Sequence, residues 1–481
     1  MSQQINKDVV SATKWSAITE IAAKLVAPIS SMVLARLLTP EAFGVLVTAT
    51  MIISFAEIFT DAGFQKYIIQ HKFGNEIELY KSTAVAFWSN LIFSLIIWIG
   101  ISICSSQIAQ IVGNDGYGSV IAISCICIPL EAFSSIQMAL FKRKMDFKTL
   151  FIARVIGVIV PLVVTIPLAY ITHSYWSLII GMIALNITNA VLLTVKSDWK
   201  PRWFYDIQLF KEMFSFTVWS MFEAIAIWLT GYVDVFIVGT MLSTYYMGIY
   251  RTSITTVGGI MAIITSATTP VLFSALSRLQ DDEEEFKQLF FKFQKLVGLL
   301  VIPLGVGIFL FRGLITEVLL GDQWKDAAYF IGLWGLTSAI TIVFSHYCSE
   351  VFRAKGKPKL SVLSQALHLC FLIPTVVVSV KYGFETLCLS RSLVRLTGII
   401  INLCILYLLV KITPIKMFLN LFHSLFASCF MVALVYVLPS TMNTIHSLLY
   451  AVTCVILYIV VICMFDDERR ILFNIKTILY K

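Results

Sequence analysis

Five long stretches of this chain contain no charged residue, and they restrict its fold more than any other feature. They cover residues 82–114, 155–195, 252–277, 327–349 and 417–465. A helix needs about 20 apolar residues to cross the hydrocarbon core of a bilayer. The second and the last stretch are long enough for two crossings each. The chain is therefore expected to cross a membrane many times.

The charge content leads to the same conclusion. Only 13% of the 481 residues are charged and 58% are hydrophobic, whereas soluble domains carry roughly 25% charged residues. This is too little charge to cover the surfaces of soluble domains. We predict an all-α polytopic membrane protein of about fourteen helices, at 12–38, 42–70, 84–111, 118–141, 150–171, 175–196, 209–241, 246–277, 291–320, 327–353, 360–381, 384–410, 417–438 and 445–465.

Lysine and arginine residues are divided unevenly between alternate loops of these helices. With the N-terminus placed inside, the inside loops hold 26 of them and the outside loops hold 5, namely Arg36, Arg251, Arg312, Lys325 and Lys381. Cytoplasmic loops of membrane proteins carry such an excess of basic residues. We therefore predict that both termini are cytoplasmic. The net charge of +8 then reflects orientation rather than nucleic-acid binding.

Two segments recur in the second half of the chain. The segment 38–45 resembles 242–249, which lies 204 residues later, and 141–144 resembles 352–355, which lies 211 residues later. Six helices per repeat is an even number, so both halves would cross the membrane the same way up, with a site between two lobes. The predicted units are a six-helix lobe at 1–205, a second at 206–412, and an additional helix pair with a cytoplasmic tail at 413–481.

Acidic side chains inside the predicted helices are candidates for function, because a charge at membrane depth needs a partner or a wet cavity. Glu57 and Asp61 lie one helical turn apart. Two like charges on one face repel unless a proton, a cation or a basic neighbour lies between them. The candidates for ion coupling or gating are Glu57, Asp61, Glu223 and Asp234. No cofactor is expected beyond coupling to H⁺ or Na⁺.

Basic side chains at membrane depth are candidates for substrate binding. Arg391 and Arg395 lie one turn apart and about two to three turns deep, too far in to reach the membrane surface easily. They predict either the wall of an anion-binding cavity or ion pairs with Glu223, Asp234 or Glu57. Arg154 either reaches the membrane interface or contributes to the cavity. Lys24 either pairs with Glu20 or contributes to the cavity. The candidate substrate-binding residues are Arg391, Arg395, Lys24, Arg154 and Arg251.

Signals of catalysis and of metal binding are weak. His346, His368 and His423 lack metal-ligand spacing, which favours hydrogen-bonded packing. The sequence contains no Walker loop, no Rossmann glycine motif and no HExxH motif. It also lacks a large polar loop outside the membrane. We therefore expect neither an ATP-driven pump nor an enzyme, and no metal site.

Several segments resemble a known family. The most specific is Ala-Arg-Leu-Leu-Thr-Pro-Glu-Ala-Phe-Gly at 35–44, supported by Lys-Trp-Ser-Ala at 14–17, Phe-Thr-Asp-Ala-Gly-Phe at 59–64 and the basic stretch at 139–147. They are similar to the bacterial polysaccharide transporter (Wzx-type) family of the multidrug/oligosaccharidyl-lipid/polysaccharide exporter superfamily. Helix number, orientation and the two-lobed repeat agree with this resemblance.

The resemblance implies a MATE-like fold and a flippase of the bacterial inner membrane. Such a protein moves an undecaprenyl-diphosphate-linked oligosaccharide from the cytoplasmic to the periplasmic leaflet, for O-antigen (lipopolysaccharide), capsule or exopolysaccharide synthesis. A polysaccharide polymerase and a chain-length regulator would be partners. The diphosphate would bind Arg391, Arg395 and Lys24, while Arg154 and Arg251 would mark the two ends of the path.

Three alternatives remain open. A cation-coupled multidrug exporter of the same superfamily would have an acidic, aromatic cavity, which the four acidic candidates allow. A non-transporting scaffold of a polysaccharide assembly complex would tolerate substitutions in its cavity. An integral-membrane polymerase or transferase would need a polar outer loop.

Overall fold

The computed structural model describes residues 29–61, 63–357, 359–437 and 444–473. Within these residues the chain forms helices and turns without a β-strand, which confirms the all-α prediction. Over the same ranges, 12 helices are long and apolar enough to cross a membrane, or 13 if a bent pair counts as one span. The chain is thus a multi-pass membrane protein. Most of the predicted first helix, with Glu20 and Lys24, lies outside the described residues.

Some predicted helices agree closely with the observed ones, whereas the predicted ranges 84–111 and 291–320 lie eight to ten residues later than the observed Glu76–Ile103 and Glu283–Leu310. The range 175–196 corresponds to Trp176–Lys196, and 246–277 corresponds to Thr244–Arg278. Several spans contain breaks that apolar content alone does not reveal. One break is a π-helical turn, Pro161–Thr165, which begins at a proline that cannot donate a backbone hydrogen bond.

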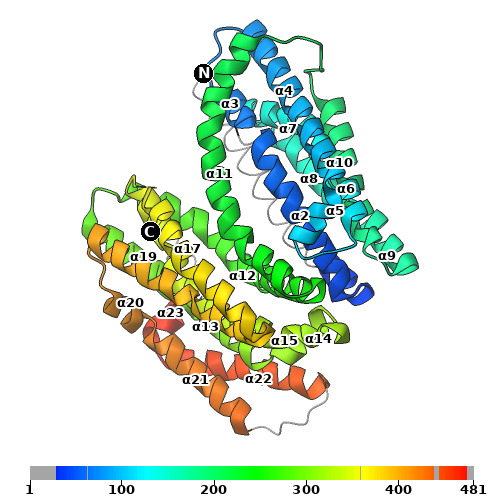
Figure 1. The fold of residues 1–481 in the computed structure, drawn as a ribbon. Coiled ribbons are helices and arrows are strands. Elements are labelled where there is room, and N and C mark those ends of the chain that lie inside the picture. The colour runs from blue at the N-terminus through cyan, green and yellow to red at the C-terminus, as the bar shows by residue number, and fades with distance from the viewer. Residues whose placement is uncertain (1–28, 62, 358, 438–443, 474–481) are drawn as a thin grey trace. The chain divides into compact units, whose positions relative to one another are not determined.

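Two compact units can be distinguished, Met1–Ile249 and Tyr250–Lys481. The helices of the first unit are drawn in blue to green in Figure 1. They are α2 (Pro40–Asp61), α3 (Phe64–Gln70), α4 (Glu76–Ile103), α5 (Ser105–Ile111), α6 (Gly118–Ser124), α7 (Cys127–Arg143), α8 (Phe147–Val160), α9 (Ile166–Thr172), α10 (Trp176–Lys196), α11 (Ile207–Met241) and the start of α12 (Thr244–Arg278).

Helix α7 lies at the centre of the first unit, where it packs against α3, α4 and α10. An aromatic core joins these helices: the ring of Phe87 lies 5.2 Å from that of Phe133 and 5.4 Å from that of Trp199. The buried amide nitrogen of Asn90 donates to Ser135 Oγ at 2.8 Å, which pairs a polar donor at membrane depth. Aromatic packing and this polar bond together fix α4 against α7.

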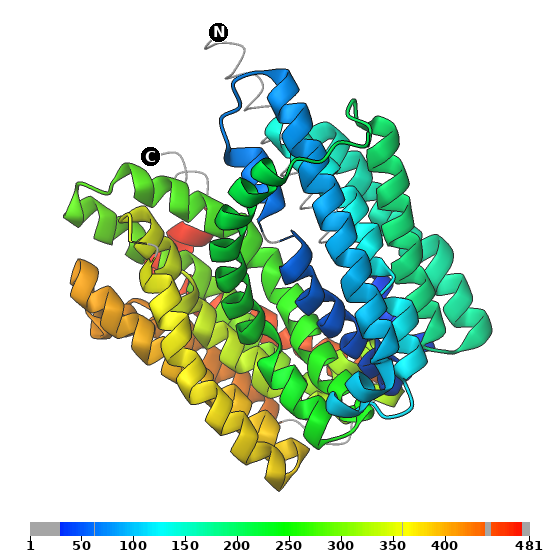
Figure 2. The ribbon, with the colours of Figure 1, turned by 45° about the horizontal axis from the view of Figure 1, so that its top comes forward.

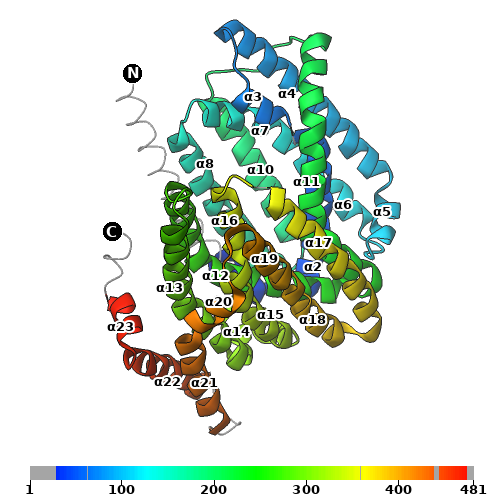
Figure 3. The same ribbon diagram turned by 90° about the vertical axis from the view of Figure 1, so that its left-hand side faces the viewer.

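The helices of the second unit follow α12 in the chain. They are α13 (Glu283–Leu310), α14 (Arg312–Leu319), α15 (Ala327–Thr341), α16 (Cys348–Ala354), α17 (Lys359–Ser379), α18 (Phe384–Leu393), α19 (Arg395–Val410), α20 (Pro414–Asn420), α21 (Phe422–Val437), α22 (Thr444–Cys463) and α23 (Asp466–Phe473). A second π-helical turn, Ile342–His346, joins α15 to α16. Helix α13 packs against α15 and α21. Helix α17 packs against α19, and the two run side by side in Figures 1 and 2. The last helices, α21 to α23, follow one another in Figure 3.

The helix starts repeat in the same way as the sequence segments. Spans begin at residues 40, 76, 118, 147 and 176, and again at 244, 283, 327, 359 and 384. Corresponding starts differ by 204 to 212 residues. This order of elements agrees with a parallel repeat, although the unit boundaries at 205 and 412 stay a prediction.

The two repeated segments contact each other inside the first unit. A Cβ added at Gly44 of α2 would lie 2.0 Å from the carbonyl oxygen of Thr244, and one added at Gly248 of α12 would lie 1.9 Å from that of Pro40. Pro40 and Thr244, like Gly44 and Gly248, are repeat-related positions. The contact is therefore nearly two-fold symmetric, and only glycine permits this approach of backbone to backbone.

Asn114, in the connection between α5 and α6, joins the same two helix starts. It is 1% exposed, and its side chain forms hydrogen bonds with the hydroxyl groups of Thr48 and Thr244. Thr48 in turn donates to the carbonyl oxygen of Gly44 at 3.1 Å. A buried amide thus links α2, α12 and the α5–α6 connection.

Candidate functional site

Two arginine side chains of the second unit lie together, as the sequence predicts. Arg391 is near the end of α18 and Arg395 begins α19, one helical turn later. Both guanidinium groups lie over the indole ring of Trp334 on α15, at 4.9 Å for Arg391 and 4.0 Å for Arg395. Arginine stacks well on an aromatic face because its charge is spread over a plane. Trp334 therefore orients both arginines.

Hydroxyl groups accept hydrogen bonds from both arginines. Arg391 Nε donates to the hydroxyl of Tyr250 at 3.1 Å, and Tyr250 is fully buried. Arg395 Nη1 donates to Ser338 Oγ at 2.7 Å and is 3.4 Å from Thr337 Oγ1. These hydroxyl groups orient the two guanidinium groups.

The arginines line a polar cavity of about 260 Å³ within the second unit. The other lining residues are Trp334, Thr341, Ser345, Ser364, Gln365, His368, Gly398 and Asn402. Among these described residues none is a carboxylate. An arginine pair that lines a polar cavity fits the geometry of a phosphate.

Hydrogen bonds hold the polar lining in place. Asn402 Nδ2 donates to Ser345 Oγ at 2.7 Å, and Ser364 Oγ donates to Asn402 Oδ1 at 2.9 Å. His368 Nδ1 lies 3.2 Å from Thr397 Oγ1. The cavity is therefore shaped by fixed amide, hydroxyl and imidazole groups, of the kind that bind hydroxyl-rich ligands.

Sequence reasoning missed most of this lining. It identified the arginines as charges at depth but assigned His368 to packing and did not single out Trp334, Gln365 or Asn402. One signal was available: Ser361, Ser364, Gln365 and His368 follow helical spacing on an otherwise apolar helix.

The acidic candidates lie in the first unit. Glu57 lines a cavity of about 210 Å³ with Glu131 of α7, Ser54 and Thr60 among its neighbours. Glu131 was not predicted, because its helix lies far from Glu57 in sequence. Asp234 is 3% exposed and accepts a hydrogen bond from the backbone of Val235. The side chains of Asp61 and Glu223 lie outside the described part of the structure.

The remaining basic candidates are not placed in one site. Arg154 is exposed on α8, and Arg251 is partly buried on α12. Lys24 lies outside the described residues. Their predicted roles in substrate binding therefore stay predictions.

The basic stretch 139–147 has a structural role. Arg143 Nη1 donates to the carbonyl oxygens of Ile68 and His71, each at 2.8 Å, and its guanidinium lies 4.7 Å from the ring centre of Phe73. These carbonyls lie at the end of α3, where helix carbonyls lack partners within the helix. Arg143 thus fixes the end of α3 onto α7.

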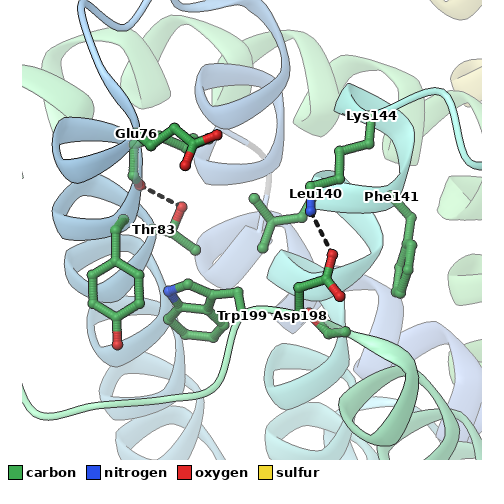
Figure 4. A pocket seen from close by; sticks show the side chains of 10 residues that line it. Glu76, Thr83, Leu140, Phe141, Lys144, Asp198 and Trp199 are labelled. Carbon is green, nitrogen blue, oxygen red and sulfur yellow. Dashed lines mark hydrogen bonds and ion pairs between the residues drawn. The ribbon is translucent and has the colours of Figure 1, made fainter.

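Lys144 forms one side of a small pocket at the ends of α4 and α7, shown in Figure 4. Its Nζ lies 2.7 Å from a carboxylate oxygen of Asp198. The hydrogen bond and charge of Lys144 lower the pKa of Asp198. Both side chains are exposed, so this ion pair contributes little stability. Leu140 and the indole of Trp199 also line the pocket.

Comparison with known proteins agrees with this architecture. A family model described as "Polysaccharide biosynthesis protein" matches residues 33–329. The chain belongs to the polysaccharide biosynthesis protein family. The match covers the segments at 35–44, 59–64 and 139–147, and the family resemblance drawn from them is thereby confirmed.

Individual relatives are distant but extensive. The chain is 23% identical over 343 residues to a succinoglycan biosynthesis transport protein, ExoT, of Rhizobium meliloti, covering 71% of this chain and 68% of that protein. It is 20% identical to the lipopolysaccharide biosynthesis protein WzxC of Escherichia coli, covering 78% and 75% respectively. Among solved structures, the lipid II flippase MurJ in an inward closed conformation aligns with a TM-score of 0.75 at 14% identity, covering 94% of this chain and 98% of that one. The structural likeness shows a shared fold.

Proposed function

We propose that this protein is a flippase that moves an undecaprenyl-diphosphate-linked oligosaccharide from the cytoplasmic to the periplasmic leaflet of the bacterial inner membrane. The observation that carries the proposal is the pair Arg391 and Arg395, stacked on Trp334 in a cavity that is also lined by amide, hydroxyl and imidazole groups. The diphosphate binds the arginines. The amide and hydroxyl groups of the same cavity bind the adjacent sugar.

Family membership and a relative whose name describes transport, ExoT, support a transporter rather than an enzyme. The product of the transport is a repeat unit for O-antigen, capsule or exopolysaccharide. A polysaccharide polymerase and a chain-length regulator act after this step and are the proposed protein partners. Both termini lie in the cytoplasm, in keeping with the distribution of basic residues.

Transport proceeds by alternating access between lobes at 1–205 and 206–412, with the helix pair at 413–481 attached to the second lobe. Lys24 assists in binding the diphosphate, while Arg154 and Arg251 act near the two ends of the path. Glu57, together with Glu131, and the carboxylates Asp61, Glu223 and Asp234 bind the proton or Na⁺ that resets the cycle.

The proposal is tested by surface glycan in cells that lack the chromosomal gene. The wild-type gene should restore glycan, and Arg391→Ala and Arg395→Ala should fail to do so at equal expression. A charge-assisted hydrogen bond contributes about 1.5–3 kcal/mol. Each substitution should therefore weaken binding of the diphosphate by about 10- to 150-fold. Lys381→Ala, which removes an exposed charge beyond α17, is the matched control.

One observation favours the alternative of a cation-coupled multidrug exporter. The cavity that holds Glu57 and Glu131 is acidic, and a neighbouring indole, that of Trp228, donates to Ser54 Oγ at 3.0 Å. This alternative predicts increased drug sensitivity in the deletion strain with intact surface glycan. The flippase predicts unchanged drug sensitivity and a loss of surface glycan in the same strain.

A further inference from the structure

A second basic pocket lies elsewhere in the second unit, between α13 and α20. It has a volume of about 350 Å³ and is lined by Phe291, Lys295, Lys416, Leu419, Asn420 and His423, which we call the lysine pocket. Its described lining contains two lysines and a histidine and no carboxylate. It shares no residue with the arginine cavity.

A bend in the chain creates the lysine pocket. Helix α20 is bent by 54° from α21, so it does not continue along the α21 axis. Asn420 fixes the bend, because its Nδ2 donates to the carbonyl oxygen of Phe291 at 2.9 Å and to Gln294 Oε1 at 3.2 Å. This tie to α13 places Lys416 and Lys295 on the same cavity.

Glu468 of α23 contacts the lysine pocket from the protein side. The Oε1 atom of this carboxylate lies 2.8 Å from Lys295 Nζ and 2.7 Å from His423 Nδ1. Glu468 is 1% exposed, whereas Lys416 is exposed. One carboxylate faces two lysines, so at least one positive charge remains in excess, and two remain when His423 is protonated.

Exposed apolar side chains lie on the helices that carry the pocket residues. Ile415, Phe418 and Leu419 of α20 and Phe422 of α21 are all exposed. A short helix that exposes apolar residues beside a lysine suits the boundary between headgroups and acyl chains. A free inorganic ion would use the positive charge but not these apolar groups.

We propose that the lysine pocket binds the phosphate headgroup of an anionic phospholipid of the surrounding bilayer, with its acyl chains along α20 and α21. Lys295 and Lys416 contact the phosphate, and Lys416 supplies the charge that Glu468 does not offset. Basic pockets between membrane helices on the cytoplasmic side bind such headgroups. The orientation predicted from the basic loops places this end of α13 and α20 in the cytoplasm.

The test is native mass spectrometry of the full-length protein titrated with phosphatidylglycerol or phosphatidylcholine of identical acyl chains. Wild-type protein should bind phosphatidylglycerol more tightly. Lys416→Ala should weaken its binding about fivefold, the equivalent of about 1 kcal/mol per lysine at a membrane surface. Lys416→Arg should retain binding, because the positive charge remains. Lys416 is exposed, so these variants should elute and melt like the wild type.

Lys292→Ala is the matched control, since Lys292 is exposed on the same helix as Lys295 but does not line the pocket. Equal binding of the two lipids by wild-type protein would overturn the proposal. So would an equal loss in Lys292→Ala, which indicates general attraction of anions. Displacement of phosphatidylglycerol by millimolar inorganic phosphate would assign the pocket to a free ion instead. The titration contains no glycolipid, so its failure would leave the flippase proposal untouched.

Discussion

The contact between the two repeated segments allows a sharp test of backbone packing. Replacing Gly44 by Ala adds a Cβ 2.0 Å from the carbonyl oxygen and 2.8 Å from the Cγ2 atom of Thr244. The first obstacle is backbone, so a side-chain rotation cannot relieve it. Helices α2 and α12 must separate, and overpacking of this kind costs about 1–3 kcal/mol. We expect Gly44→Ala to lie near the upper end of that range.

The repeat-related change should have the same effect. A Cβ at Gly248 would lie 1.9 Å from the carbonyl oxygen of Pro40 and 2.9 Å from the backbone nitrogen of Gly44. Because both substitutions separate the same two helices, the double variant should lose less stability than the sum of the single losses. Additive losses would indicate two independent contacts.

The assay is thermal unfolding of the purified protein in detergent, with Gly100→Ala as control. A Cβ at Gly100 would have no heavy atom within 4 Å, and alanine is favoured over glycine in a helix by about 1 kcal/mol. The control should therefore melt at or above the wild-type temperature, while the two test variants melt well below it. If Gly44→Ala melted like the control, the backbone contact would not exist in the protein.

Three further substitutions test single interactions by the same unfolding assay. Arg143→Ala should destabilise by about 2 kcal/mol, because two carbonyl groups at the end of α3 lose a charged donor. Lys144→Ala breaks an exposed pair and should leave the stability nearly unchanged. Asn114→Ala should cost about 1–3 kcal/mol by removing the hydrogen bonds of the buried amide with the Thr48 and Thr244 hydroxyl groups, and a neutral result would contradict the hydrogen-bonded link. Burial opposes ionisation of Glu468, but hydrogen bonds from Lys295 and His423 outweigh it and lower its pKa. A carboxyl group with a lowered pKa stabilises the fold above its ordinary pKa of about 4.3, and this stability is lost as the pH falls through the lowered value. Glu468→Gln should therefore reduce the decrease in unfolding temperature over that acid range. An unchanged dependence of unfolding temperature on pH would contradict the Glu468 interaction.

The sequence predicted the helices well because a single physical requirement determines them. An apolar, uncharged run must satisfy its backbone hydrogen bonds within a helix when it crosses a bilayer. The same requirement made Arg391 and Arg395 conspicuous, since charges at depth are rare. The repeat was also visible, because the turn around Pro40 and its counterpart at Thr244 keep similar residues.

Other features depend on tertiary packing and were not predictable. Glu131 joins Glu57, and Trp334 lies under the arginine pair, only because distant helices meet in space. The bend between α20 and α21 has no proline or glycine at its centre from which it could have been predicted. It is held by Asn420, whose partners lie more than a hundred residues earlier.

The most direct test of the proposed function is translocation in vesicles. Purified protein is reconstituted with a fluorescent undecaprenyl-diphosphate-linked oligosaccharide, and the fraction that reaches the opposite leaflet is measured by quenching from outside. Wild-type protein and Lys381→Ala should translocate the lipid, whereas the Arg391→Ala and Arg395→Ala variants, equally well folded, should not. Unimpaired translocation by both arginine variants would contradict the cationic cavity, and no translocation by the wild type would contradict the flippase itself.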